Sequence, residues 1–286
     1  MSNATFRYLF ALLLFGSNGI VASLIELSSQ HIVLLRTLIG SVFLIAIFFM
    51  TGGKLTFHQH KRQLFFLAVS GMAMGASWMC LYAAYARIGV SVASLLYYCG
   101  PVIVVVLSPL LFKERIGANT FIGFAAVIAG VLCINGNAFS DSRDVVGIFC
   151  GLLSALLYAL MVICNRMAKE ITGLENATLQ LTAAFFTAAA FTGLKSGFAM
   201  HLTSTSILPI LILGLLNTGV GCYLYFSSIG KLNVQTVAVC GYVEPLSAVL
   251  FSAVFLNERM LPLQIAGAAL IIGGAVLSEF HKRRPT

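Results

Sequence analysis

The sequence predicts an all-α polytopic membrane protein, in which ten transmembrane helices form two inverted five-helix repeats. Three observations lead to this prediction: the composition, the length of the apolar segments and an internal repeat. Hydrophobic residues make up 59% of the 286 residues and charged residues only 9%, with a mean hydropathy of +0.99. Soluble domains carry about 25% charged residues. This chain cannot solvate its surface in water, so we expect it to lie in a lipid bilayer.

Apolar segments of helical length recur along the whole chain. A helix needs about 20 mostly apolar residues to cross about 30 Å of hydrocarbon. The first segment is interpreted as a helix and not as a cleaved signal peptide, because no clear small-x-small cleavage site follows it before Glu26. The ten segments of suitable length are 6–25, 30–51, 64–87, 91–112, 117–135, 145–168, 176–195, 207–230, 234–256 and 261–280.

The chain repeats itself with a shift of 144 residues. Pro101 corresponds to Pro245, and thirteen residues after each proline stands a Glu-Arg pair, Glu114-Arg115 and Glu258-Arg259. Matches among apolar residues arise easily by chance in such a composition, but a charged pair at a fixed distance from a proline does not. The chain is therefore predicted to contain two copies of one unit. The same shift also matches Tyr98 with Tyr242, Ser108 with Ser252, Gly123 with Gly267 and Gly130 with Gly274.

The two predicted units, residues 6–135 and residues 145–280, contain five helices each. Because five is an odd number, the second unit enters the membrane from the opposite side. Two halves related in this way by an axis in the membrane plane can exchange conformations around a central site. The inversion favours a transporter that works by alternating access around a midplane cavity.

Basic residues are distributed unevenly between the predicted loops. With both termini inside, twelve Lys and Arg residues lie on the inner side and four on the outer side, and Arg36 is left within a helix. Short loops rich in Lys and Arg stay in the cytoplasm. We therefore expect a multi-pass protein of the inner or plasma membrane with both termini cytoplasmic. This topology accounts for the net charge of +8 without a nucleic-acid partner.

Side chains that commonly bind metals or cofactors do not form a recognisable motif. All seven cysteines fall within predicted helices and none forms a Cys-x-x-Cys pair, which favours packing roles. His58 and His60 lie in a basic loop without acidic or cysteine ligands nearby. The sequence contains neither a P-loop nor a Gly-rich dinucleotide fingerprint. We expect no metal, no cofactor and no direct use of ATP.

Glycines at four-residue spacing occur in two of the predicted helices, as Gly71 and Gly75 and as Gly147 and Gly151. Small residues at this spacing allow the backbones of membrane helices to approach closely. We interpret both pairs as packing seams within a monomer, with the face of a homodimer as the alternative.

The two proline segments resemble the EamA domain. Gly100-Pro101 and Glu244-Pro245 are each followed by an apolar run, which ends in Leu-Phe-Lys-Glu114-Arg115 or Phe-Leu-Asn-Glu258-Arg259. The tandem arrangement is similar to that of the drug/metabolite transporter superfamily, and the resemblance covers nearly the whole chain. It implies a ten-helix carrier. It does not imply one substrate, because members carry amino acids, sugars, nucleotide-linked compounds and drugs.

Two ionisable residues inside the predicted helices are the first candidates for function. An ionisable side chain at a helix centre costs about 2.5–3.5 kcal/mol on insertion scales. Arg36 lies about six residues into its helix, where it could bind an anionic substrate group or snorkel to the outer interface. Glu244 lies near the midplane beside Pro245, where it could carry a coupling proton or act as a neutral hydrogen-bond donor at the proline kink. Pro101 marks the equivalent kink.

Aromatic and amide side chains supply the rest of the predicted cavity. A buried tyrosine or asparagine must find a hydrogen-bond partner, so such residues line a polar pocket or bond to neighbouring helices. A wider set of candidates contains Tyr97, Tyr158, Asn165 and Tyr225. The predicted substrate-binding residues are Asn18, Arg36, Trp78, Tyr82, Tyr98, Asn217, Tyr223 and Tyr242, with Glu244 for coupling.

These observations favour a secondary transporter that exports small amphipathic metabolites such as amino acids, with proton or ion coupling. A passive channel and an uptake permease are the alternatives, and a channel differs from a carrier in that its flux never saturates. An intramembrane enzyme is disfavoured, because it would need a nucleophile and a base or a metal at depth, where no histidine lies.

The charge distribution predicts which loops are accessible from outside. A cysteine placed in loop 137–144 should react with a membrane-impermeant thiol reagent added to intact cells, while a cysteine placed at 56–60 should not. Labelling is compared with that of the chain carrying only its own seven cysteines. The reverse pattern would contradict both the orientation and the inversion that follows from it.

Overall fold

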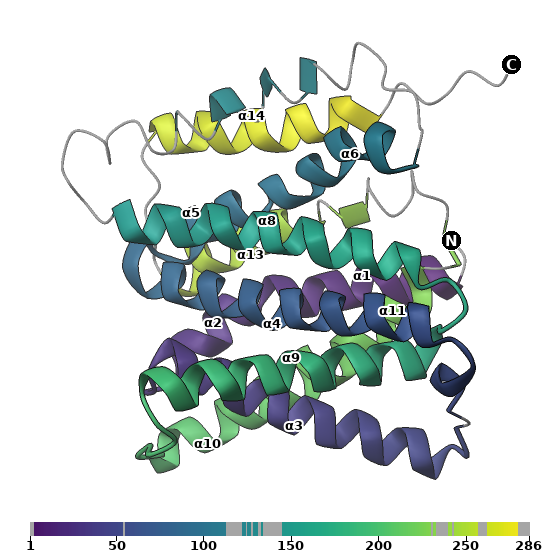
Figure 1. Cartoon of the computed structure of the whole chain (residues 1–286). Helices are drawn as coiled ribbons and strands as arrows, with labels where there is room; N and C mark the ends of the chain where they lie inside the picture. The colour runs from purple at the N-terminus through teal and green to yellow at the C-terminus, as the bar shows by residue number, and fades with distance from the viewer. Residues whose placement is uncertain are drawn as a thin grey trace, which may run out of the picture.

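Long helices running back and forth across one bundle make up the protein, as the computed structural model shows (Figure 1). The structure describes residues 3–53, 55–112, 122–123, 125–126, 128–130, 133, 145–229, 231–232, 240–241, 243–256 and 262–279. These residues contain no strand, which confirms the all-α prediction for this part of the chain. Six helical stretches within it are long and apolar enough to span a membrane: Asn3–Ser23, Ser29–Met50, Lys61–Ile88, Val145–Met167, Gly173–Lys195 and Ser204–Ile229.

Four predicted helices appear as single continuous helices. They are α3 (Ser29–Met50), α4 (Lys61–Ile88), α8 (Val145–Met167) and α9 (Gly173–Lys195). The last two helices are α13 (Val243–Phe255) and α14 (Pro262–Glu279). Most of the predicted helix 117–135 lies outside the described residues, as do residues 234–239 and 242 of the predicted helix 234–256. The number ten therefore stays a prediction.

Three other predicted helices are interrupted, which the hydropathy pattern did not indicate. The first divides into α1 (Asn3–Gly16) and α2 (Asn18–Ser23), and the fourth divides into α5 (Val90–Tyr97) and α6 (Cys99–Phe112). The second break lies three residues before Pro101, whose ring and missing N–H disfavour a regular helix in the preceding turn.

The eighth predicted helix changes its type instead of breaking. It consists of α10 (Ser204–Leu211), the π-helical segment η2 (Ile212–Val220) and α11 (Gly221–Ile229). π-Helical turns are rare and occur frequently at functional sites. The hydroxyl of Thr218 donates to the carbonyl oxygen of Leu213, five residues earlier, at 2.7 Å, which fits the i→i+5 spacing of this segment.

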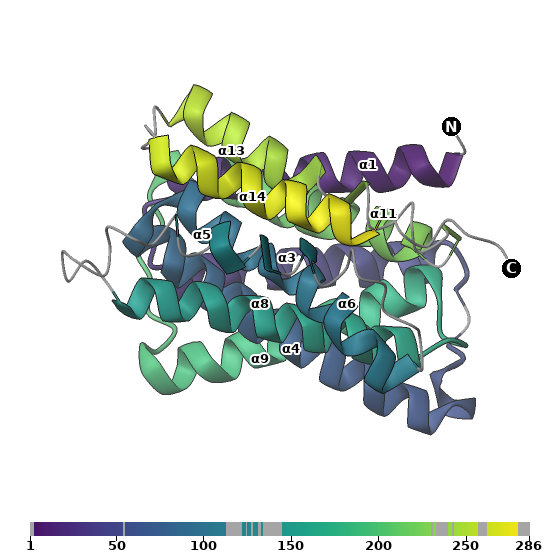
Figure 2. The same ribbon diagram turned by 90° about the horizontal axis from the view of Figure 1, so that it is seen from above.

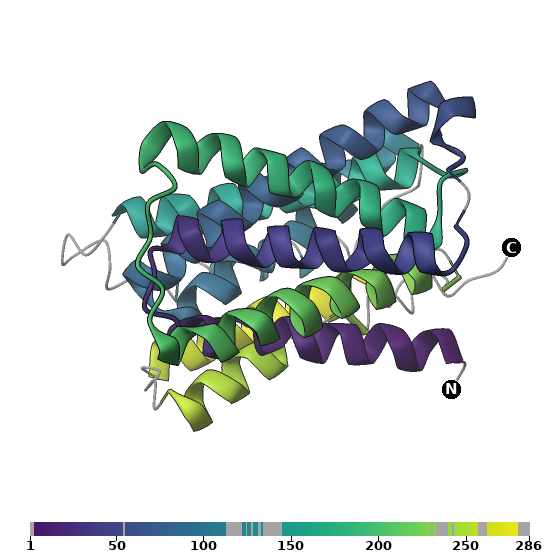
Figure 3. The same ribbon diagram turned by 90° about the horizontal axis from the view of Figure 1, so that it is seen from below.

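Helices from the two halves of the chain interleave, and their contacts come in equivalent pairs. In the predicted repeat, α1, α3 and α4 correspond to α8, α9 and the η2–α11 segment. The contact of α4 with α8 is matched by that of α11 with α1. The contact of α3 with η2 is likewise matched by that of α9 with α4. Figure 3 shows α3, in purple, lying between α9 and the green helix that contains η2.

The two halves also cross the bundle in opposite directions. α1 begins at the end of the bundle marked N, whereas α8 begins at the opposite end and runs back toward it (Figure 1). α6 ends on the side where α1 begins, and α14 lies beside α6 at the edge of the bundle (Figures 1 and 2).

The glycine pair of α4 forms a packing seam within the chain, as predicted. A Cβ atom added at Gly71 would lie 2.4 Å from the backbone oxygen of Gln180, and one at Gly75 would lie 2.6 Å from that of Ala184. α4 and α9 can therefore approach this closely only because these positions lack side chains.

Candidate functional site

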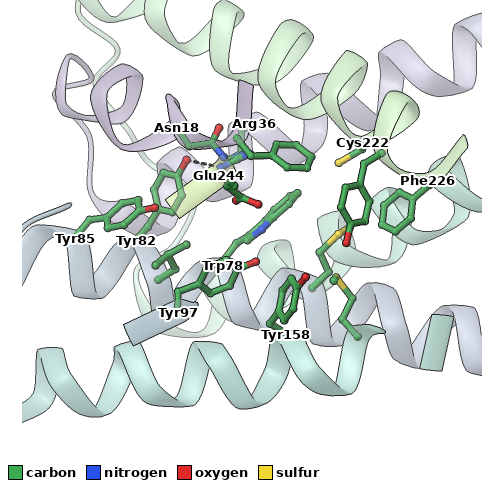
Figure 4. Close-up of a pocket in the computed structure, with 15 residues that line it drawn as sticks. Asn18, Arg36, Trp78, Tyr82, Tyr85, Tyr97, Tyr158, Cys222, Phe226 and Glu244 are labelled. Atoms are coloured by element: carbon green, nitrogen blue, oxygen red, sulfur yellow. Dashed lines mark hydrogen bonds between the residues drawn. The ribbon is translucent and has the colours of Figure 1, made fainter. Parts of the chain in front are cut away.

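Helices from both halves of the chain enclose a cavity (Figure 4). It contains about 540 Å³ of empty space, part of which is open to the outside. The cavity is lined by Phe15, Asn18, Arg36, Met74, Trp78, Leu81, Tyr82, Tyr85, Tyr97, Tyr158, Met161, Cys222, Tyr225, Phe226 and Glu244.

Arg36 on α3 is the strongest hydrogen-bond donor of the cavity. Its Nε donates to Thr218 Oγ1 at 2.8 Å, and its Nη1 donates to the hydroxyl of Tyr82. The guanidinium carbon lies 4.3 Å from the ring centroid of Trp78, in a cation–π contact. The side chain is 0% exposed, so the snorkelling alternative is wrong.

One nitrogen of the Arg36 guanidinium has no hydrogen-bond acceptor among the described residues. Nη2 of Arg36 is buried and has no hydrogen-bond partner within the described part of the chain. A buried unsatisfied donor costs about 1–3 kcal/mol, and more when the group is charged. An anionic group entering the cavity would remove this cost.

Glu244 brings the opposite charge to the same cavity. It lies in the first turn of α13, and its carboxyl group has the hydroxyl of Tyr98 as a hydrogen-bond partner. Figure 4 shows Glu244 and Arg36 facing the same space, and the two groups interact electrostatically. They do not form a hydrogen-bonded pair, because Thr218 and Tyr82 are the partners that the structure gives Arg36.

Asn18 begins α2 directly after the break at Ser17. Its Oδ1 accepts a hydrogen bond from Nδ2 of Asn217 at 3.1 Å. The same Nδ2 donates to the carbonyl oxygen of Leu14 at 2.8 Å and to Ser17 Oγ at 2.9 Å. Asn217 thus links η2 by hydrogen bonds to the junction between α1 and α2, and it fixes the position of Asn18 in the cavity wall.

Aromatic rings form the wall away from Arg36. The rings of Tyr97 and Tyr158 lie 5.2 Å apart, and Tyr225 lies 5.8 Å from Phe15 and 5.1 Å from Phe226. Such rings can contact the apolar part of a ligand while the tyrosine hydroxyls meet its polar edges. The cavity therefore joins a charged region to an apolar one.

Five of the nine predicted cavity and coupling residues border the cavity: Asn18, Arg36, Trp78, Tyr82 and Glu244. Tyr98 is buried next to it as the partner of Glu244. Asn217 and Tyr223 lie outside the lining, and Tyr242 lies outside the described residues. Pro101 lies in α6 and Pro245 in α13. Asn165, from the wider set, bonds Asn176 at 3.1 Å instead.

Helical spacing explains three of the seven lining residues that the sequence analysis does not predict. Met74, Leu81 and Tyr85 lie three or four residues from Trp78 or Tyr82 on α4, so one helix face presents all five to the cavity. Extending the two predicted residues by the helical period would have found the other three.

The same rule explains why Tyr223 does not line the cavity. Cys222, Tyr225 and Phe226 share one face of α11 at spacings of three and four residues, and this face borders the cavity. Tyr223 follows Cys222 directly and points about a quarter turn away. It packs, partly buried, against the hydrophobic core.

Comparisons with known proteins agree with the bundle and its two halves. A model of the EamA-like transporter family matches the chain twice, at residues 5–136 and 145–280. A crystal structure of a protein that is 18% identical matches with a TM-score of 0.72 over 99% of both chains, which shows the same fold.

Several curated relatives carry names that describe transporters. The uncharacterized transporter YxxF of Bacillus subtilis is 23% identical and aligns over 99% of this chain and 91% of its own length. The uncharacterized transporter YdfC of the same organism is 26% identical and aligns over 90% of this chain and 83% of its own length. The uncharacterized inner membrane transporter YicL of Salmonella typhimurium is 23% identical over 96% and 95%.

The Tyr82 hydroxyl should contribute more to stability than that of its neighbour Tyr85. Tyr82→Phe leaves Nη1 of the buried Arg36 without its acceptor, so we expect a loss of about 1–3 kcal/mol in the free energy of unfolding. Tyr85→Phe is the control, because among the described residues the hydroxyl of Tyr85 has one hydrogen-bond partner, Ser94, at a long 3.5 Å. Thermal unfolding of the purified variants measures both effects. Equal melting temperatures would contradict the assigned role of Tyr82.

Proposed function

This chain belongs to the EamA-like transporter family, and from that premise we propose that it is a secondary transporter that exports small amphipathic metabolites such as amino acids. The membership confirms the resemblance predicted from the two proline segments. Together with the six apolar spans, it makes the protein a multi-pass membrane transporter with a small-molecule substrate and the lipid bilayer as its surroundings. Substrate, direction, coupling and mechanism belong to the proposal.

The observation that carries the proposal is the unpartnered Nη2 of Arg36 at the cavity. Arg36 is held by Thr218 and Tyr82 and stacks on Trp78, so its free donor has a defined direction. A substrate carboxylate bound there would satisfy it, with the strength of a charge-assisted hydrogen bond. The aromatic wall then contacts the apolar part of the substrate. An amino acid has both parts.

Alternating access is the mechanism that suits the arrangement of the helices. The contacts between the halves come in equivalent pairs, and α1 and α8 cross the bundle in opposite directions. Both features support two inverted repeats with boundaries near 6–135 and 145–280. α6 ends and α8 begins at opposite ends of the bundle, which supports a further crossing by the predicted helix 117–135.

The proposed transport unit is the monomer in the cell membrane with both termini cytoplasmic. The described residues of one chain enclose the cavity, which supports a monomer as the unit that binds and carries the substrate. The orientation rests on the uneven distribution of Lys and Arg between the loops.

Glu244 is the proposed coupling residue. An anionic carboxylate in a membrane cavity is costly, so this side chain is a site where a proton can be bound and released as the cavity changes sides. The groups that act on it electrostatically or by hydrogen bonding are Arg36, Tyr85, Tyr97, Tyr98 and Tyr225. Arg36 is the cation among them, so substrate binding at Arg36 is linked to the charge of Glu244.

Substitution of Arg36 tests the substrate site. A thermal-shift panel of L-α-amino acids first selects the ligand that raises the melting temperature most. Arg36→Lys keeps a positive charge but loses the forked donor geometry. We expect about tenfold weaker binding of that ligand, equivalent to about 1.4 kcal/mol. The carboxamide of the same amino acid is the matched control ligand, and it should bind weakly to both proteins. Unchanged affinity in Arg36→Lys would contradict the assignment.

Substitution of Glu244 tests the coupling. Glu244→Gln keeps size and hydrogen bonding but cannot titrate. In proteoliposomes the variant should lose transport driven by a pH gradient and retain substrate counterflow, because exchange needs the carrier cycle but no net proton movement. Saturation and counterflow in the unmodified protein distinguish a carrier from a channel, and vesicles of known orientation distinguish export from uptake. A variant with unchanged rate and pH dependence would make Glu244 a packing residue.

A further inference from the structure

Two consecutive residues of the π-helical segment η2, Asn217 and Thr218, contact two polar residues that line the cavity, Asn18 and Arg36. Asn217 donates from Nδ2 to Oδ1 of Asn18 at 3.1 Å. Thr218 accepts at Oγ1 the hydrogen bond from Nε of Arg36 at 2.8 Å. Asn217 and Thr218 are 2% and 0% exposed, and neither lines the cavity. Both act on the cavity through another residue.

The π-helical geometry directs the Thr218 hydroxyl. That hydroxyl donates to Leu213 O at 2.7 Å, so its lone pairs are left to accept from Arg36. In an α-helix the hydroxyl would meet the carbonyl of the residue four positions earlier, which is Gly214. η2 also packs tightly on α3, because a Cβ atom at Gly214 would lie 2.7 Å from the side chain of Ile39. The local helix type and the position of Arg36 are thus linked.

The two bonds leave one donor of each cavity residue for a ligand. With Oδ1 engaged by Asn217, the amide nitrogen of Asn18 is its remaining polar group. With Nε and Nη1 engaged, Arg36 keeps the unpartnered Nη2. One neutral and one charged N–H donor beside the same cavity suit the two oxygens of a carboxylate.

We infer that Asn217 and Thr218 are positioning residues, which orient the amide of Asn18 and the guanidinium of Arg36 as a paired donor site for the anionic group of the substrate. This inference rests on the proposed function, in which Arg36 receives that group. It adds two residues and the segment η2 to the determinants of specificity for anions.

Trp78 provides an intrinsic fluorescence probe of the site at Arg36. Trp78 is the one tryptophan of the sequence, and its ring lies 4.3 Å from the guanidinium carbon of Arg36. Iodide is an anion that quenches tryptophan fluorescence on contact, whereas acrylamide quenches it without charge. Excitation at the red edge of the tryptophan absorption band excludes fluorescence from the tyrosines. Iodide bound at Arg36 in the purified full-length protein therefore appears as a saturable component of quenching, which acrylamide lacks.

Removal of the positioning groups should weaken that component. For Thr218→Val we expect the iodide concentration at half-maximal quenching to rise about three- to tenfold, with acrylamide quenching unchanged. Thr218→Ser, which keeps the hydroxyl, should restore the original value. Thr37→Val is the matched control, because Thr37 is buried and directly follows Arg36 in the sequence. Its partners within the described part of the chain are carbonyl groups of its own helix, Val33 O and Leu34 O.

A second variant keeps the test decisive if Thr218→Val does not fold. Asn217→Leu has a similar size but cannot hold Asn18, and it should weaken iodide quenching in the same direction. If Arg36→Lys weakens saturable quenching while Thr218→Val and Asn217→Leu leave it unchanged, the positioning inference is overturned and the proposed function stands. If Arg36→Lys also leaves it unchanged, or the unmodified protein shows no saturable component, the anion site at Arg36 fails and the inference fails with it.

Discussion

The guanidinium of Arg36 joins three helices at one point in the bundle. Its backbone belongs to α3, its Nη1 bonds Tyr82 on α4, and its Nε bonds Thr218 on η2. A charged group at this depth is costly unless it is satisfied, so each of these contacts is needed to hold the charge in place. The satisfaction is incomplete at Nη2, and Arg36 is one of the residues that line the cavity. The same constraint thus accounts for helix packing and for a ligand site.

The irregular backbone of this protein is concentrated around the cavity. The first helix breaks at Ser17, between the lining residues Phe15 and Asn18, and the fourth breaks at Tyr98, directly after the lining residue Tyr97. The π-helical η2 supplies Thr218 to Arg36. Within a membrane, non-helical backbone is tolerated where protein buries it or where it lines a cavity, because lipid cannot satisfy its polar groups. Polar side chains meet this need: Asn217 bonds Leu14 O, and Ser17 Oγ bonds the same carbonyl at 2.8 Å.

Several parts of the site could be predicted from the residues alone. Arg36 and Glu244 were recognisable because ionisable residues are rare and costly within apolar helices. Trp78 and Tyr82 were recognisable because aromatic residues with polar atoms need partners at depth. Met74, Leu81 and Tyr85 were not, since apolar residues are common and only their position on the face of Trp78 and Tyr82 distinguishes them. The sequence predicts Asn217 as a lining residue, but it does not reveal that Asn217 Nδ2 bonds the broken first helix.

The sequence by itself determined the membrane class and the helical content, because both follow from composition and from the length of the apolar segments. It also determined the duplication, because the same residues recur at a shift of 144 positions. The tertiary structure alone decided which helices break, where the π-helical segment lies and which side chains meet. Those outcomes depend on contacts between residues far apart in the chain, such as Arg36 with Thr218, 182 positions later. Local propensity cannot encode such a contact, because the free energy of satisfying a buried charge is set by the partners that packing brings to it.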